Sequence, residues 1–168
     1  MLIRYIGIWL AASLLAAAPA IAEPSDLTLI VIVSGHAPVT VTNADLAKLP
    51  AVGLSASFKT EQGVRTGSFT GPLLWSVLTQ SGAVDAEKHR DAVRQAVLIT
   101  GQDGYVAVLA LAEIAPEFEG KQVILATSAD NKPLDGHWRL VVPADQRGGR
   151  SVRDVVRIEI VSLASAHP

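Results

Sequence analysis

Short runs of apolar residues, many of them β-branched, recur along the chain from residue 27 onward. The run at 27–33 is continuous and ends in Ser34–Gly35, which is the pattern of a buried strand. Val39–Thr42 alternates apolar and polar positions, as expected of a second strand. The same criteria predict a hairpin of 54–60 and 64–69 about the turn 61–63, a second hairpin of 96–100 and 105–109 about Asp103–Gly104, and strands at 123–127, 138–142 and 152–161, with a polar loop at 128–136.

Helical spacing is confined to a few short segments. Asn43 is expected to cap a short helix over 44–49, because its side chain can accept from the first turn. Gly71–Pro72 is expected to open a second helix, in which the apolar positions of 73–78 recur at helical spacing. The segments 85–94 and 111–118 are predicted to be short helices or loops. Many strands with few short helices predict an α+β domain with a mainly β core.

The N-terminal 22 residues have the three parts of a secretory signal peptide. A basic start with Arg4 precedes an uncharged, mostly apolar stretch that ends in Ala20–Ile21–Ala22, with small residues at the cleavage position. The alternative is an uncleaved anchor, but 18 uncharged residues barely reach the roughly 20 that a spanning helix needs. We therefore expect a signal peptide at 1–22, a periplasmic location, and one domain at 23–168 without a transmembrane segment.

Composition and charge exclude several classes of function. The formal net charge is −2 and no basic run occurs, so we expect no nucleic-acid partner. The chain has no cysteine, hence no disulfide and no thiolate for a metal or a substrate. The four histidines have no metal-ligand spacing, and no G-x-S-x-G motif marks a nucleophilic serine. We predict neither a metal site nor a catalytic residue.

Five motifs in order resemble those of the sulfite-oxidase-type molybdopterin-binding domain. The resemblance covers about 27–161 and predicts that fold for the single domain. It also implies a ligand of the pterin or molybdopterin type. The motifs are TGPLLWSVL at 70–78, TGQDGY at 100–105, NKPL at 131–134, RLVVP at 139–143, and GGRSVR at 148–153 followed by RIE at 157–159.

The chain departs from this family at one position that matters chemically. The resemblance implies that molybdenum is held by the pterin dithiolene and by one cysteine thiolate. Thr60 stands about where that cysteine would fall. A threonine hydroxyl is a hard ligand and a poor substitute for a soft thiolate. We therefore expect the pterin-like ligand without molybdenum.

The candidate ligand-binding residues lie in two loops, one helix and one strand end. A glycine–arginine loop can bring backbone amides and guanidinium groups to an anion, and the resemblance places a pterin phosphate there. The alternatives are an ordinary tight turn for this loop, a self-capped hairpin turn for Asp103 and Tyr105, and a core position for Trp75. The predicted set is Arg147, Gly148, Gly149, Arg150, Ser151, Arg153, Asp103, Tyr105, Trp75 and Thr60.

Three functional hypotheses follow. The first is a non-catalytic periplasmic protein that binds a small planar, pterin-like ligand and signals its occupancy to a membrane-bound partner. The second is a molybdopterin-dependent oxidoreductase in which Thr60, Glu61 or water replaces the cysteine. The third is an interaction module that kept the fold, lost the pocket and binds only a protein partner.

Overall fold

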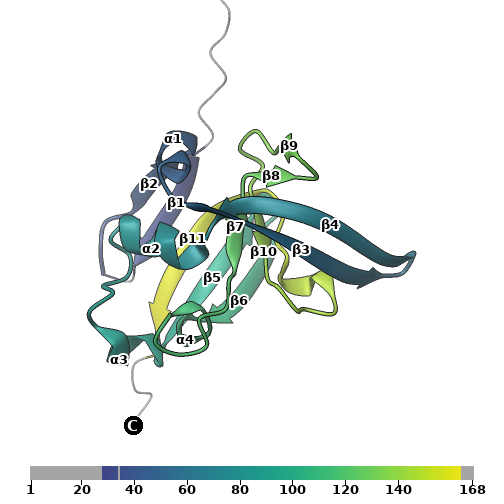
Figure 1. Ribbon diagram of the computed structural model, residues 1–168. Helices are drawn as coiled ribbons and strands as arrows, with labels where there is room; N and C mark the ends of the chain where they lie inside the picture. Colours follow the sequence, from purple (N-terminus) through teal and green to yellow (C-terminus); the bar gives the residue numbers. More distant parts are fainter. Residues whose placement is uncertain (1–27, 34, 164–168) are drawn as a thin grey trace, which may run out of the picture.

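The computed structural model describes residues 28–33 and 35–163, apart from the side chains of Thr60 and His89. The predicted signal peptide at 1–22 lies outside the described residues. The described chain is mainly β with few short helices, as the sequence predicts (Figure 1). In chain order its elements are β1 (Thr28–Val33), β2 (Val39–Thr42), α1 (Asn43–Ala47), β3 (Ala51–Thr60), β4 (Gly63–Pro72), α2 (Leu74–Gln80), α3 (His89–Ala92), β5 (Gln95–Gly101), β6 (Val106–Ala110), α4 (Leu111–Ile114), β7 (Ile124–Ala126), β8 (Ser128–Ala129), β9 (Lys132–Pro133), β10 (Arg139–Val141), the 3-10 helix η1 (Gly148–Arg150) and β11 (Val155–Ser162).

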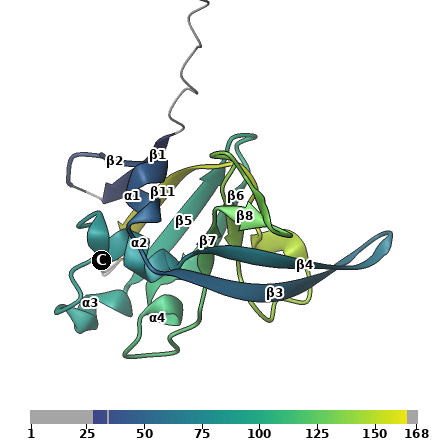
Figure 2. The ribbon, with the colours of Figure 1, turned by 45° about the horizontal axis from the view of Figure 1, so that its top comes forward.

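Within the described residues the largest sheet has five strands in the order β2-β1-β11-β5-β6. Strands β1 and β11 are parallel, and the other neighbours are antiparallel. Helices α2 and α4 lie on one side of this sheet (Figures 1 and 2). Side chains alternate between the two faces of a strand, so every second residue points toward these helices. The buried core on this side includes Leu29, Ile99, Leu109, Leu78 and Ile158.

A second layer is built on the β3–β4 hairpin, whose strands pair without interruption from Ala51 and Pro72 to Thr60 and Gly63. The hairpin projects beyond the five-stranded sheet (Figure 1). Strands β8 and β9 extend its sheet, and β7 pairs with β10 beside it. Phe58 and Phe69 pack beneath the hairpin in a second, smaller apolar cluster with Ile124 of β7.

The helix expected to open at Gly71–Pro72 begins later. Both residues end β4, and α2 starts at Leu74. A glycine is required at position 71 for a steric reason. A Cβ there would lie 2.7 Å from the Ala126 Cα, which is closer than real Cβ atoms come to backbone. The glycine therefore allows β4 to cross closely over β7.

The helix expected over 44–49 forms as α1, but its cap is not Asn43. Thr42 Oγ1 accepts from the Asp45 N–H at 3.2 Å, and the Asp45 carboxylate accepts from the Thr42 N–H at 3.1 Å. This reciprocal pair is a capping box. Asn43 instead accepts a hydrogen bond from Trp138 Nε1 at 2.8 Å. Trp138, the first residue of the strand predicted at 138–142, is 1% exposed and belongs to the core.

Other differences concern boundaries. The polar loop at 128–136 contains the short strands β8 and β9, and the final strand starts at Val155 instead of residue 152. Tyr105 precedes β6 and is not part of it. Asp154 has a φ of 50°, a left-handed conformation that interrupts an extended strand just before β11.

Candidate functional site

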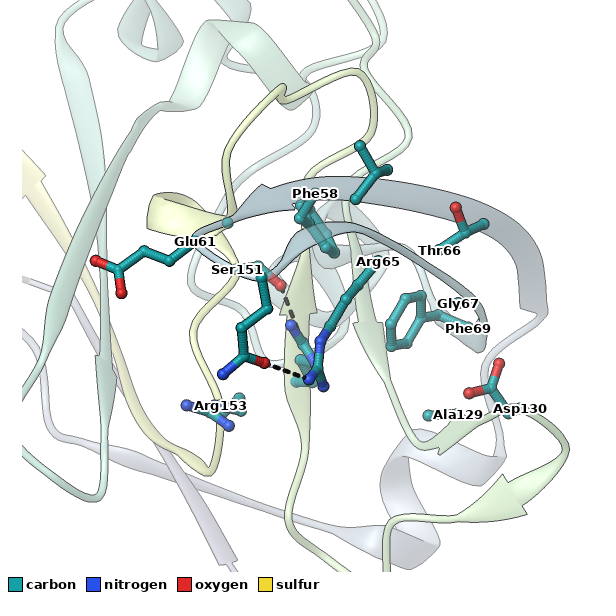
Figure 3. A pocket seen from close by; sticks show the side chains of 14 residues that line it. Phe58, Glu61, Arg65, Thr66, Gly67, Phe69, Ala129, Asp130, Ser151 and Arg153 are labelled. Atoms are coloured by element: carbon teal, nitrogen blue, oxygen red, sulfur yellow. Dashed lines mark hydrogen bonds between the residues drawn. The ribbon is translucent and has the colours of Figure 1, made fainter.

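A cavity of about 960 Å³ opens between the tip half of the β3–β4 hairpin and the segment that carries η1. Figure 3 shows aromatic, cationic and hydroxyl side chains around it, contributed by segments far apart in the sequence. The hairpin supplies one wall, since its strands continue far enough beyond the main sheet to overhang the η1 segment. Its lining residues are Phe58, Glu61, Gln62, Val64, Arg65, Thr66, Gly67, Phe69, Ala129, Asp130, Arg139, Gly148, Ser151 and Arg153.

Arg139, the first residue of β10, lies against two aromatic rings of the hairpin. Its guanidinium carbon is 5.7 Å from the Phe58 ring centroid and 5.2 Å from the Phe69 centroid. Both distances are within the range of a cation–π interaction. Burial, followed by the nearby charge of Arg153, lowers the pKa of Arg139 from its ordinary value. An arginine nevertheless remains protonated in proteins, so a positive charge stands at the inner wall of the cavity.

Ser151 holds this guanidinium in place. Arg139 Nε donates to Ser151 Oγ at 3.0 Å (Figure 3). Ser151 Oγ in turn donates to the Leu140 carbonyl at 2.9 Å. The serine hydroxyl thus links the loop after η1 to β10 by one accepted and one donated hydrogen bond. Arg139 is thereby fixed in orientation without a carboxylate partner among the described residues.

Two further guanidinium groups line the cavity, those of Arg65 and Arg153. Arg65 donates to Gln62 Oε1 at 2.9 Å. Among the described residues no ion pair is formed by Arg65, Arg139 or Arg153. Three cationic side chains that are not neutralised by direct pairing favour an anion in the space between them.

Two carboxylates also line the cavity, Glu61 at the hairpin tip and Asp130 at the β8–β9 turn. Asp130 Oδ1 accepts from the Ser68 N–H at 2.9 Å. Asp130 has a φ of 48°, as a tight two-residue connection between antiparallel strands requires. Its carboxylate is therefore engaged in joining β8 to β4.

The predicted glycine–arginine loop is divided by its conformation. Gly148 and Ser151, with Arg153 just beyond, line the cavity. Arg150 makes contacts elsewhere: its Nη2 lies 2.6 Å from Asp145 Oδ1 and its Nη1 lies 3.0 Å from Glu113 Oε1.

Glu113 is the centre of a small charge cluster that holds η1. It also accepts from Lys121 Nζ at 2.6 Å. Burial by itself raises the pKa of Glu113, but the hydrogen bonds from Lys121 and Arg150 lower it by more. The hydrogen bond to Asp145 raises the pKa of Arg150. Arg150 is thus placed as an anchor of the loop.

Asp103 and Tyr105 lie behind the loop and do not line the cavity. Asp103 Oδ1 accepts from the Tyr105 N–H at 2.9 Å, which closes the β5–β6 turn. The Tyr105 hydroxyl donates to the Gly149 carbonyl at 2.6 Å. The aromatic side chain ties this turn to η1 and so supports the cavity wall from outside.

The remaining predicted residues are dispersed. Trp75 of α2 lines a separate cavity of about 530 Å³, together with Val33 and His36. Arg147 forms a backbone bridge with Lys59 of β3 and is not among the residues lining the arginine-rich cavity. Thr60 ends β3, and its side chain lies outside the described part of the structure.

The residues predicted from the sequence to bind a ligand did not include Arg65, Arg139, Phe58 or Phe69. Arg139 could have been noticed in the sequence, because it begins an otherwise apolar strand and arginines are rarely buried without a partner. Phe58 and Phe69 had no comparable signal, since they pair with other residues in the hairpin and meet only around Arg139.

Among the described residues, no group of three or more histidine, cysteine, aspartate or glutamate side chains gathers in a way that could hold a metal ion. No helix in the described part of the chain combines the length and the apolar character needed to cross a membrane.

Comparisons with known proteins inform the fold. No family model matches the sequence, and no curated protein matches it. The solved structure of the sulfane dehydrogenase SoxCD from Paracoccus pantotrophus matches with a TM-score of 0.63 and 19% sequence identity. The match covers 85% of this chain and 40% of that chain. The chain therefore shares the fold of a part of that sulfane dehydrogenase, whose full length it does not span.

Proposed function

We propose that the protein binds a small planar anion, with a pterin as the type example, in the cavity beneath the β3–β4 hairpin. The observation that carries this proposal is the guanidinium of Arg139, fixed by Ser151 at the cavity wall without a carboxylate partner among the described residues. Arg153 supplies a second guanidinium in the same cavity. Two guanidinium groups can receive a carboxylate or phosphate by paired N–H donors.

A planar ligand is favoured by the shape and chemistry of the wall. The guanidinium is flat and weakly hydrated, so it can stack on a π system as well as donate hydrogen bonds. Phe58 and Phe69 already hold Arg139 by such contacts. The likeness of fold to the sulfane dehydrogenase chain supports the wider assignment to the sulfite-oxidase type, which the sequence motifs suggested.

The donor groups around the cavity fit an organic anion better than a molybdenum centre. Guanidinium, hydroxyl, amide and carboxylate groups line it, and the chain has no cysteine. A soft thiolate ligand is therefore not available from this protein. We accordingly propose ligand binding without redox chemistry.

Location and partner belong to the same proposal. Export by the segment at 1–22 would place the cavity in the periplasm, where ligand occupancy would be passed to a membrane-bound protein. Fractionation of cells producing the full chain tests the location: recovery of the shortened protein with the periplasmic contents supports it, and recovery with the cytoplasm contradicts it.

Titration with pterin-6-carboxylate, whose own fluorescence reports binding, tests the ligand class. We expect saturable binding with a dissociation constant of about 10 μM, typical of a small site with two charge-assisted contacts. Arg153→Gln should weaken binding at least about tenfold, since it removes one charged donor. Arg139→Lys should do the same, because it keeps the charge but loses the planar fork.

The matched control is Arg94→Gln, an exposed arginine between α3 and β5 that does not line the cavity. It makes the same chemical change and should leave the affinity unaltered. No saturable binding by the wild-type chain, or equal weakening by Arg94→Gln and Arg153→Gln, would overturn the proposal.

A further inference from the structure

The face of the five-stranded sheet opposite α2 and α4 is open to solvent in the described structure. Residues that alternate with the buried ones point outward there. Ile30, Val106 and Val108 are 41%, 46% and 54% exposed. These β-branched side chains lie toward the two sides of one exposed sheet face, and an exposed face with apolar residues is a candidate interaction surface.

The strand register arranges the outward side chains in two parallel rows. Val31 of β1 and Ile158 of β11 lie between these two rows in the register, and their side chains are buried on the opposite face of the sheet. The first row runs Ile30, Arg157, Thr100, Val106, and the second runs Ile32, Glu159, Leu98, Val108.

The rows are alike in apolar character and opposite in charge. Ile30 and Ile32 form one end, and Val106 and Val108 form the other. At the centre stand Arg157 and Glu159, which pair with each other at 2.8 Å between Nη2 and Oε2. Exchanging the two rows would therefore put apolar residues on apolar residues at both ends, Arg157 on Glu159, and Thr100 on Leu98.

We propose that this open face binds a second copy of the chain, which gives a two-fold symmetric dimer packed sheet on sheet. A two-fold axis that lies between the sheets and perpendicular to the strands exchanges the two rows. Arg157 of each copy then faces Glu159 of the other, and Val106 of each faces Val108 of the other. Two such sheets pack about 10 Å apart.

The charge pattern also selects this symmetry over its nearest alternative. A two-fold axis parallel to the strands that passes over β11 would set Arg157 against Arg157 and Glu159 against Glu159. Like charges brought together in an interface cost several kcal/mol, so that arrangement is disfavoured. The pattern is thus self-complementary in one orientation of the second copy.

Sedimentation equilibrium of the purified protein, from about 1 μM to about 1 mM, measures the association. We expect a dimer whose dissociation constant rises at least about tenfold in R157E and in E159R, because each change leaves four like charges at the centre. The double variant R157E/E159R restores opposite charges across the axis and should dimerise like the wild type. V108K should give a monomer, since it puts two charges into the apolar end.

All four variants change exposed or half-buried side chains, and circular dichroism with thermal unfolding verifies their fold. A wild-type chain that stays monomeric would leave the face to a different protein and overturn the proposal. So would a dimer indifferent to the single charge reversals, or a double variant as weak as the single ones. Pterin-6-carboxylate binding is independent of these outcomes, because the cavity and the open face share no residue.

Discussion

Arg139 Nε donates a hydrogen bond to Ser151 Oγ at 3.0 Å, which connects the start of β10 to the loop that follows η1. The two residues lie in separate sequence motifs, and their contact defines the orientation of the guanidinium that faces the cavity. A serine at this position is thus a positioning residue, whose effect on a ligand would be transmitted through Arg139.

Ser151→Ala tests this positioning. The change leaves Arg139 Nε without its acceptor and the Leu140 carbonyl without its donor, in a partly buried setting. We expect pterin-6-carboxylate affinity to fall about fivefold and the free energy of unfolding to fall by about 1–2 kcal/mol, as measured by fluorescence titration and urea unfolding. Ser151→Thr retains the hydroxyl and should recover affinity, and a Ser151→Ala variant with wild-type affinity would contradict the role.

Asn43→Ala tests the buried contact with Trp138. The Trp138 indole N–H donates to Asn43 Oδ1 at 2.8 Å, and the tryptophan is 1% exposed. Removal of the Asn43 side chain therefore leaves a buried donor without its acceptor. We expect the free energy of unfolding in urea to fall by about 1–3 kcal/mol. Asn43→Asp keeps an acceptor oxygen and should lose less. Equal losses in the two variants would show that the hydrogen bond does not account for the effect.

Gly71→Ala tests the close crossing of β4 over β7. The added Cβ would lie 2.7 Å from the Ala126 Cα, and this backbone has no rotamer with which to move away. We expect destabilisation of about 3 kcal/mol or a chain that does not fold. The control is Gly53→Ala in the same hairpin, whose Cβ would meet only Thr70 Oγ1 at 3.8 Å. A tolerated Gly71→Ala would disprove the crossing.

Glu113→Gln tests the charge cluster around η1. Hydrogen bonds from Lys121 and Arg150 lower the pKa of Glu113 below its ordinary 4.5, despite the opposing effect of burial. An acid with a lowered folded pKa contributes stability above its unfolded pKa, and this contribution is lost as pH falls through the folded value.

The wild type should therefore exceed Glu113→Gln in urea stability by about 1–3 kcal/mol at pH 7. The difference should shrink as pH falls below about 4.5. Glu87→Gln, an exposed glutamate outside this charge cluster, serves as the control. A difference that stays constant down to pH 3 would contradict a role for the carboxylate charge.

The strands and the site were predictable to different degrees. Alternating and continuous apolar runs predicted both hairpins and the edge and central strands. Side chains alternate between the two faces of a strand, so the burial of one or both faces appears directly as a pattern of apolar residues. The predictions around Gly71–Pro72 and Asn43 were wrong for a common reason. Each residue type suits a helix start, but each is used here for a contact with a segment more than 50 positions away, which local propensity cannot register.

Patterns along the chain are enough to predict a mainly β domain with few short helices, the lack of thiolate chemistry, and a loop rich in glycine and arginine. Which arginines meet depends on the packing of the folded chain. It turned Arg150 into an ion-paired anchor and joined Arg139 to Phe58 and Phe69 of the hairpin. The physical reason is that a guanidinium's role depends on whether a carboxylate lies within reach. That proximity is set by how β3, β4, β10 and η1 pack, and spacing along the chain does not encode it.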